Sequence, residues 1–248
     1  MRISQVFISR PRQEARELAG LLTPLGLQAI VQPAFEYASL DLRASDPQGY
    51  ARFEAAPPGS LAVFTSPRAV QHGLAQLPRQ RLLQLRVAAI GPATATALAA
   101  AGVPATVAAD AGYTSEALLK TLAAETPGEA FIVAAPGGRR ALLEGLSALG
   151  WRVGMLMVYQ ARAAELDPAV VAALGKAEAL LSVWTSGNAM SALAQRLPPA
   201  AWFRVCRGEW LVISERLKRL ARAYGPSHIH LADGPGNQAL LAAVRRLL

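Results

Sequence analysis

The sequence has few of the residues that metal sites, disulfides and nucleophilic catalysis require. Its 248 residues include one cysteine, Cys206, and three histidines. A single cysteine cannot form an internal disulfide and fits a reducing cytosol, and Cys206 lies in no catalytic signature, so we expect it to be structural. His228 and His230 would share one face of a strand without a third ligand, and His72 has no visible nucleophile partner. We therefore expect no metal site.

Long apolar segments are also missing. No stretch of about 18 uninterrupted apolar residues is found, so we expect no membrane span. Residues 1–10 lack the apolar core of a signal peptide. No G-x-G-x-x-G motif follows a candidate strand, which leaves dinucleotide binding without support. These absences lead us to expect a cytoplasmic protein with no membrane partner.

Lysine is scarce, although the chain is strongly basic. The net charge is +8, and only three of the 25 basic residues are lysine. Arginine suits bidentate recognition of carboxylate or phosphate, but a genomic bias toward alanine, glycine and arginine codons explains the same composition. The arginines are dispersed and aromatics are only 6%, so a nucleic-acid-binding stripe is not indicated. The charge suggests an anionic partner without naming it.

Short apolar runs alternate with helical patterns, and hydrophobic residues make up 52% of the chain. The helix predicted over 12–25 carries an apolar stripe of period 3.6 and ends at Gly26, a typical C-cap. The alternation predicts an α/β protein with parallel sheets flanked by helices. The candidate strands are Val6–Ser9, Leu61–Thr65, Val87–Ile90, Ala130–Ala134, Ala179–Thr185, Trp210–Ser214 and His228–Ala232.

The chain repeats itself with a circular offset, which predicts two similar α/β domains. Phe64-Thr65-Ser66 returns as Trp184-Thr185-Ser186, and the segment 7–37 returns as 131–161. In one arrangement, extended segments pair as crossovers between the domains. Its boundaries are 1–36 and 164–248 for one domain, 41–158 for the other, and 37–40 and 159–163 for the linkers. The alternative is two consecutive halves split near residue 125, and the repeats alone do not decide between them.

Several candidate strands lead into helices through small or hydroxyl residues. Ligands bind outside the carboxyl ends of strands in open parallel sheets, and helix N-termini suit anions. Serine and threonine are also ordinary N-caps, yet the duplicated Thr-Ser motif favours one site shared by both copies. A further strand-to-helix turn contains Gly138 and only loosely resembles a phosphate loop, because the Gly-Lys-Ser/Thr ending is absent. The hydroxyl-bearing turns are Ser9-Arg10-Pro11, Thr65-Ser66-Pro67, Gly91-Pro92-Ala93-Thr94 and Thr185-Ser186-Gly187-Asn188.

Tyr159 lies in the second crossover segment and matches Phe35 in the first. One copy therefore has a hydroxyl that the other lacks. Many tyrosines only pack, and Tyr37 is the obvious rival for a functional role.

Taken together, these motifs resemble the uroporphyrinogen-III synthase family, and the resemblance covers nearly the whole chain. This sequence departs from the family pattern at Ser214-Glu215-Arg216, where other members carry a Gly-Pro-Thr-Thr-like turn. The motifs that carry the resemblance are Ile8-Ser9-Arg10-Pro11, Phe64-Thr65-Ser66-Pro67, Ile90-Gly91-Pro92-Ala93-Thr94-Ala95, Gly137-Gly138-Arg139, Val158-Tyr159-Gln160, Trp184-Thr185-Ser186 and Val212-Ile213-Ser214-Glu215-Arg216-Leu217.

The resemblance implies the crossed arrangement, with two similar domains joined by a two-stranded linker and a cleft between them. It implies a monomeric, cofactor-free lyase of heme biosynthesis that closes linear hydroxymethylbilane into uroporphyrinogen III, losing water and inverting ring D. It gives Tyr159 the role of assisting departure of the hydroxyl. A non-catalytic, two-lobed small-anion binding protein is the alternative. The implied carboxylate-binding positions are Arg10, Thr65, Ser66, Thr94, Gly138, Thr185, Ser186 and Ser214.

Overall fold

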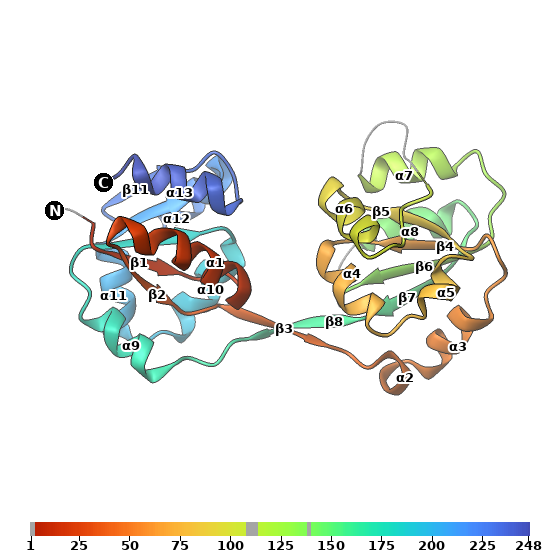
Figure 1. Ribbon diagram of the computed structural model, residues 1–248, viewed down its shortest axis with the longest axis horizontal. Coiled ribbons are helices and arrows are strands. Elements are labelled where there is room, and N and C mark those ends of the chain that lie inside the picture. Colours follow the sequence, from red (N-terminus) through yellow and green to blue (C-terminus); the bar gives the residue numbers. More distant parts are fainter. Residues whose placement is uncertain (1–2, 108–113, 138–139) are drawn as a thin grey trace. The chain divides into compact units, whose positions relative to one another are not determined.

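The computed structural model describes residues 3–107, 114–137 and 140–248 (Figure 1). It confirms the α/β class, because two parallel sheets are each flanked by helices. The chain divides into two compact units. The discontinuous unit comprises Met1–Glu36 and Arg162–Leu248, and the continuous unit comprises Tyr37–Ala161. No helix among the described residues is long and apolar enough to span a membrane.

The discontinuous unit contains a five-stranded parallel sheet in the order β11-β10-β9-β1-β2. Apolar side chains cover both faces, as expected for a parallel sheet: Phe7 packs with helices α9 to α12, whereas Val6 and Ile8 pack with α1 and α13. The strands are β1 (Gln5–Ile8), β2 (Gln28–Val31), β9 (Leu180–Trp184), β10 (Glu209–Val212) and β11 (His228–Leu231). The helices are α1 (Arg12–Leu22), η1 (Thr23–Leu25), α9 (Pro168–Gly175), α10 (Gly187–Arg196), α11 (Pro199–Arg207), α12 (Glu215–Arg222) and α13 (Asn237–Arg245).

The helix predicted over 12–25 is shorter than expected. α1 ends at Leu22, and a 3-10 turn continues to Leu25. Pro24 in this turn has no backbone N–H with which to extend the α-helical hydrogen bonds. Gly26 follows with φ = 72° and caps the turn in the left-handed conformation that glycine favours, as predicted.

The continuous unit contains a four-stranded parallel sheet in the order β5-β4-β6-β7. Phe131 and Val133 of β6 pack with helices α2 to α6, and the alternate residues of β6 pack with α7 and α8. The strands are β4 (Leu61–Phe64), β5 (Arg86–Ala89), β6 (Glu129–Ala134) and β7 (Arg152–Met157). The helices are α2 (Leu42–Ser45), α3 (Pro47–Ala55), α4 (Pro67–Leu74), α5 (Arg79–Leu82), α6 (Pro92–Ala100), α7 (Ser115–Leu122) and α8 (Arg140–Ala148).

The two sheets share one topology, which matches the predicted repeat. β9, β10, β1 and β2 take the places that β4, β5, β6 and β7 take in the other sheet. An isolated parallel bridge between Ala88 and Val107 stands where β11 stands in the larger sheet. β1 pairs with β9, with Val6 opposite Leu181, rather than with β4. This pairing is the one that the crossed arrangement predicts.

Strands β3 (Phe35–Ser39) and β8 (Tyr159–Ala163) form a separate two-stranded sheet. Hydrogen bonds flank it at both ends: Leu40 N–H donates to the Val158 carbonyl, and Ala164 N–H donates to the Ala34 carbonyl. The two strands therefore run in opposite directions. β7 ends at Met157 and β8 begins at Tyr159, so Tyr159 lies at the carboxyl edge of the four-stranded sheet.

Candidate functional site

Tyr159 lies at the centre of an aromatic and hydroxyl cluster in the continuous unit. Its side chain is 9% exposed. The His72 imidazole stacks on its ring, with centroids 5.1 Å apart and planes 18° apart. The Tyr37 ring meets it edge-on at 5.9 Å. The two rings from α4 and β3 thus restrict the orientation of the phenol.

The Tyr159 hydroxyl is hydrogen bonded to Ser66, with the two oxygens 3.2 Å apart. Ser66 is the N-cap of α4, where its Oγ accepts from the Ala69 N–H at 3.1 Å. When Ser66 donates its own proton to the phenol oxygen, the phenol proton remains available for a ligand oxygen. The pair can therefore serve as a hydrogen-bond donor or general acid.

His72 has a partner that the sequence did not reveal. Its Nδ1 lies 2.8 Å from Ser39 Oγ of β3, a residue 33 positions away. Burial lowers the pKa of His72 below its ordinary value of 6.5, and the positive charge of Arg68 lowers this pKa further. The imidazole next to Tyr159 is therefore neutral at neutral pH.

Arg68 brings positive charge to the same cluster. Its guanidinium carbon lies 4.0 Å from the centroid of the Tyr37 ring, a cation–π contact. Arg68 is in the first turn of α4, where the helix dipole also favours anions. Arg68 and the dipole of α4 therefore place positive charge beside Tyr37, which contacts Tyr159.

Two predicted ligand-binding hydroxyls have structural partners instead. Thr65 Oγ1 donates to the Val133 carbonyl at 3.0 Å, and Thr94 Oγ1 donates to the Ile90 carbonyl at 2.7 Å. Both side chains are buried. Because each hydroxyl proton already has a backbone acceptor, these residues fix the strand-to-helix turns. Their backbone N–H groups are engaged too, that of Thr65 by the Val133 carbonyl and that of Thr94 by the Gly91 carbonyl.

The turn before α6 has a second feature. Gly91 is its N-cap and has φ = 98°, a conformation that side chains with a Cβ rarely adopt. The helix begins at Pro92 without a side-chain cap. The Gly-Pro pair therefore leaves this helix N-terminus open for an anion.

In the discontinuous unit, the predicted residues lie at the carboxyl ends of β1, β9 and β10. Arg10 donates to Asn237 Oδ1 at 2.6 Å, so part of its guanidinium is held by α13. Ser214 Oγ caps α12 by accepting from Leu217 N–H at 3.3 Å. Thr185 and Ser186 precede α10, and Ser186 makes no side-chain cap bond. Within the described part of the chain, the Thr185 and Ser186 hydroxyls have no hydrogen-bond partner.

The two copies of the repeat thus differ in chemistry. Tyr159 bears a hydroxyl bonded to Ser66, whereas its counterpart Phe35 packs against the core of the discontinuous unit. Gly138, the remaining predicted position, lies outside the described residues. The structure brings Ser66 and Tyr159 together and adds Ser39, His72 and Arg68, which the sequence reasoning did not assign. No motif pointed to Ser39 or His72, because their contact joins β3 to α4 across 33 positions of the sequence.

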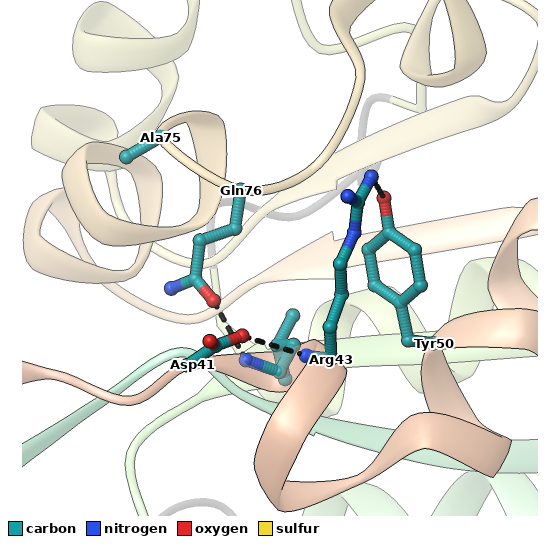
Figure 2. A pocket seen from close by; sticks show the side chains of 6 residues that line it. Asp41, Arg43, Tyr50, Ala75 and Gln76 are labelled. Carbon is teal, nitrogen blue, oxygen red and sulfur yellow. Dashed lines mark hydrogen bonds between the residues drawn. The ribbon is translucent and has the colours of Figure 1, made fainter.

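A pocket of about 290 Å³ lies near the other end of α4 (Figure 2). Gln76 Oε1 accepts from Leu42 N–H. Figure 2 shows the Arg43 guanidinium donating to the Tyr50 hydroxyl. These polar groups already bond one another, so the pocket offers less chemistry than the Tyr159 cluster. Its lining residues are Asp41, Leu42, Arg43, Tyr50, Ala75 and Gln76.

Metal-ligating side chains do not converge in the part of the chain that the structure describes. Over the described residues 3–107, 114–137 and 140–248, no three or more His, Cys, Asp or Glu side chains form a metal-binding group. His230 Nε2 instead lies 2.7 Å from Glu209 Oε2. Burial raises the pKa of the Cys206 thiol, which keeps it protonated and weakly nucleophilic at neutral pH.

Comparison with known proteins gives a consistent result. A family model described as uroporphyrinogen-III synthase HemD matches residues 16–242. The uroporphyrinogen-III synthase of Escherichia coli K12 is 30% identical over 97% of this chain and 99% of its own length. The uroporphyrinogen-III synthase of Salmonella typhimurium LT2 is 32% identical over 97% of this chain and 99% of its own length. The crystal structure of uroporphyrinogen-III synthetase from Helicobacter pylori 26695 has the same fold, with a TM-score of 0.66 at 14% identity over 99% of this chain and 100% of that one.

Proposed function

The chain belongs to the uroporphyrinogen-III synthase family, and from this premise we propose that it closes linear hydroxymethylbilane into uroporphyrinogen III. In this reaction, the substrate loses water and its ring D is inverted, so the enzyme is a hydro-lyase. The observation that supports the proposal best is the match to the Escherichia coli synthase over almost the full length of both chains. The Tyr159 cluster supplies a chemical basis for it.

The proposed catalytic group is Tyr159. Loss of water begins when the C–O bond of the hydroxymethyl group breaks, and the pyrrole nitrogen lone pair supplies the electrons. The leaving oxygen needs a proton or a strong hydrogen bond, which the phenol provides while Ser66 hydrogen bonds to the phenol oxygen. Such assistance contributes about 10²–10⁴ in rate. Binding that holds the two ends of the substrate in reacting geometry supplies the rest.

The carboxylates of the substrate are bound, in this proposal, at the carboxyl edges of both sheets. The open N-terminus of α6 and the unbonded hydroxyls of Thr185 and Ser186 support this assignment. Thr65 and Thr94 take part by shaping the strand-to-helix turns, because their hydroxyls and their backbone N–H groups already donate to protein carbonyls. The proposed binding positions are Arg10, Thr65, Ser66, Thr94, Gly138, Thr185, Ser186 and Ser214. Affinity for a polycarboxylate porphyrinogen should weaken as salt rises, and an affinity independent of salt would argue against this electrostatic binding.

We also propose that the protein acts as a cytoplasmic monomer without a cofactor, with 1–36 and 164–248 as one folding domain and 41–158 as the other. The compact unit that joins Met1–Glu36 with Arg162–Leu248 supports these boundaries. Amide hydrogen exchange in low urea should show 1–36 losing protection together with 164–248, because β1 pairs with β9. Loss of protection in 1–36 together with 41–158 would contradict the assignment, and a dimer in sedimentation analysis would contradict the monomer.

The decisive experiment adds purified protein to hydroxymethylbilane and separates the ring isomers after oxidation to porphyrins. Without protein, the substrate closes without inversion. We expect the protein to convert most of the substrate to the inverted isomer. Formation of only the non-inverted ring, with substrate nevertheless bound, would support the alternative of a non-catalytic anion-binding protein.

A further inference from the structure

We propose that His72 is a positioning residue for Tyr159, and that its imidazole, held by Ser39, keeps the phenol in the orientation that presents its hydroxyl to the substrate. This inference rests on the proposed role of Tyr159. His72 itself would not touch the reacting atoms. It acts through the ring that it contacts.

The first argument is the geometry of the stack. The imidazole lies nearly parallel to the phenol, 18° between planes, at a centroid distance of 5.1 Å that is typical of offset stacking. Tyr37 contacts the same ring edge-on, and Ser66 hydrogen bonds to the Tyr159 hydroxyl. A change in the χ1 angle of Tyr159 would drive its ring away from all three contacts. His72 supplies the contact that covers a face of the ring.

The second argument is that His72 is itself fixed. Its Nδ1 is hydrogen bonded to Ser39 Oγ at 2.8 Å. Gln76 Nε2 donates both to the His72 carbonyl and to the Val158 carbonyl, each at 3.2 Å. One amide group therefore ties the turn of α4 that carries His72 to the residue that directly precedes Tyr159. Gln76 is anchored in turn by Leu42, whose N–H donates to Gln76 Oε1 at 2.8 Å.

The third argument separates positioning from proton donation by His72. Burial and the charge of Arg68 lower the pKa of His72, so it is neutral at neutral pH and holds no excess proton for the leaving group. Its ring remains available for stacking. Phenylalanine at this position should therefore preserve the function, whereas alanine should not.

A double-mutant cycle tests the proposal in the isomer-resolved turnover assay. His72→Ala should lower kcat about three- to tenfold with KM changed less than twofold, because orientation rather than substrate affinity is lost. His72→Phe should restore at least half of the wild-type kcat. In the Tyr159→Phe background, His72→Ala should cause no further loss, because the hydroxyl that it positions is gone. Rates are expressed per folded protein, measured by circular dichroism.

The outcomes that overturn the proposal are distinct. An equal fractional loss from His72→Ala with and without the Tyr159 hydroxyl would show that His72 acts independently of it. A His72→Phe protein as slow as His72→Ala would show that an imidazole nitrogen is needed. Full turnover of Tyr159→Phe would refute the role of Tyr159 and with it this inference, whereas a slow Tyr159→Phe with additive losses refutes the inference alone.

A second readout needs no activity. The chain has five tyrosines, so labelling with ring-¹³Cζ tyrosine gives few NMR signals, and Tyr159→Phe assigns the one of interest. We expect His72→Ala to shift or broaden the Tyr159 signal, since the stacked ring no longer shields and holds it. His72→Phe should keep a sharp signal, and Ser39→Ala should broaden it less than His72→Ala does. An unchanged Tyr159 signal in His72→Ala would overturn the proposal.

Discussion

Replacing Ser66 by alanine should affect the protein far more than the same change at Ser186, although both serines occupy the same place in the repeat. Each follows a central strand and is the N-cap residue of the next helix. Ser66 Oγ accepts from Ala69 N–H and also bonds the Tyr159 hydroxyl. Ser186 makes no side-chain cap bond. The pair therefore forms a matched comparison within one chain.

The magnitudes follow from the lost interactions. Loss of the α4 cap costs about 0.5–2 kcal/mol. Loss of the bond to Tyr159 costs about 0.5–1.5 kcal/mol more, because the phenol is largely buried. Ser66→Ala should thus lower the free energy of unfolding of the continuous unit by about 1–3.5 kcal/mol. Ser186→Ala removes no bond to a described residue and should change stability by less than about 0.5 kcal/mol.

Two measurements locate the effect. Trp151 lies in the continuous unit, whereas Trp184, Trp202 and Trp210 form one cluster in the other, so single-tryptophan variants can follow each unit during urea unfolding. Amide hydrogen exchange at Ala69 should accelerate in Ser66→Ala, since its N–H loses its acceptor. Equal stability losses in Ser66→Ala and Ser186→Ala would refute the reasoning. So would unchanged exchange at Ala69.

The remaining predictions concern the same cluster and its surroundings. Tyr159→Phe should lower stability by about 0.5–1.5 kcal/mol and should lower turnover about ten- to thousandfold. The inverted isomer should still be the main product. Tyr37→Phe is the matched control, and equal rates in the two variants would remove Tyr159 from the mechanism. Thr94→Val should lower stability by about 1 kcal/mol, because the Thr94 hydroxyl bonds the Ile90 carbonyl. It should leave inhibition of turnover by uroporphyrinogen unchanged. A tenfold weaker inhibition would show that this hydroxyl is a direct ligand. Because the pKa of His72 is lowered in the folded protein, His72 of the unfolded chain is protonated first as pH falls. The stability that neutral His72 contributes is therefore present above pH 6.5. It is lost as pH falls from 6.5 through the folded pKa. His72→Gln should flatten this slope in urea titrations from pH 7 to 5, and an unchanged slope would exclude His72 as its source.

Several features of the fold could be predicted from the sequence because they are local. Alternating apolar runs and 3.6-period stripes indicated strands and helices, and Gly26 was correctly predicted as a cap. Pro24 shortened the first helix in a way that the apolar stripe could not indicate. The repeated Thr-Ser motif correctly indicated two sheets of one topology. Local patterns depend on residues a few positions apart, and the sequence displays them directly.

Tertiary structure alone decided which segments pair and what each hydroxyl contacts. The pairing of β1 with β9, which supports the crossed arrangement, could not be read from the sequence, since either order satisfies the same apolar patterns. The matching Thr-Ser motifs differ in their contacts, because Ser66 bonds a tyrosine hydroxyl whereas Ser186 makes no side-chain cap bond. The contact of Ser39 with His72 left no trace in the sequence. A hydrogen bond depends on atoms within about 3 Å, and that proximity is fixed by the packing of distant strands and helices, not by the spacing of residues along the chain.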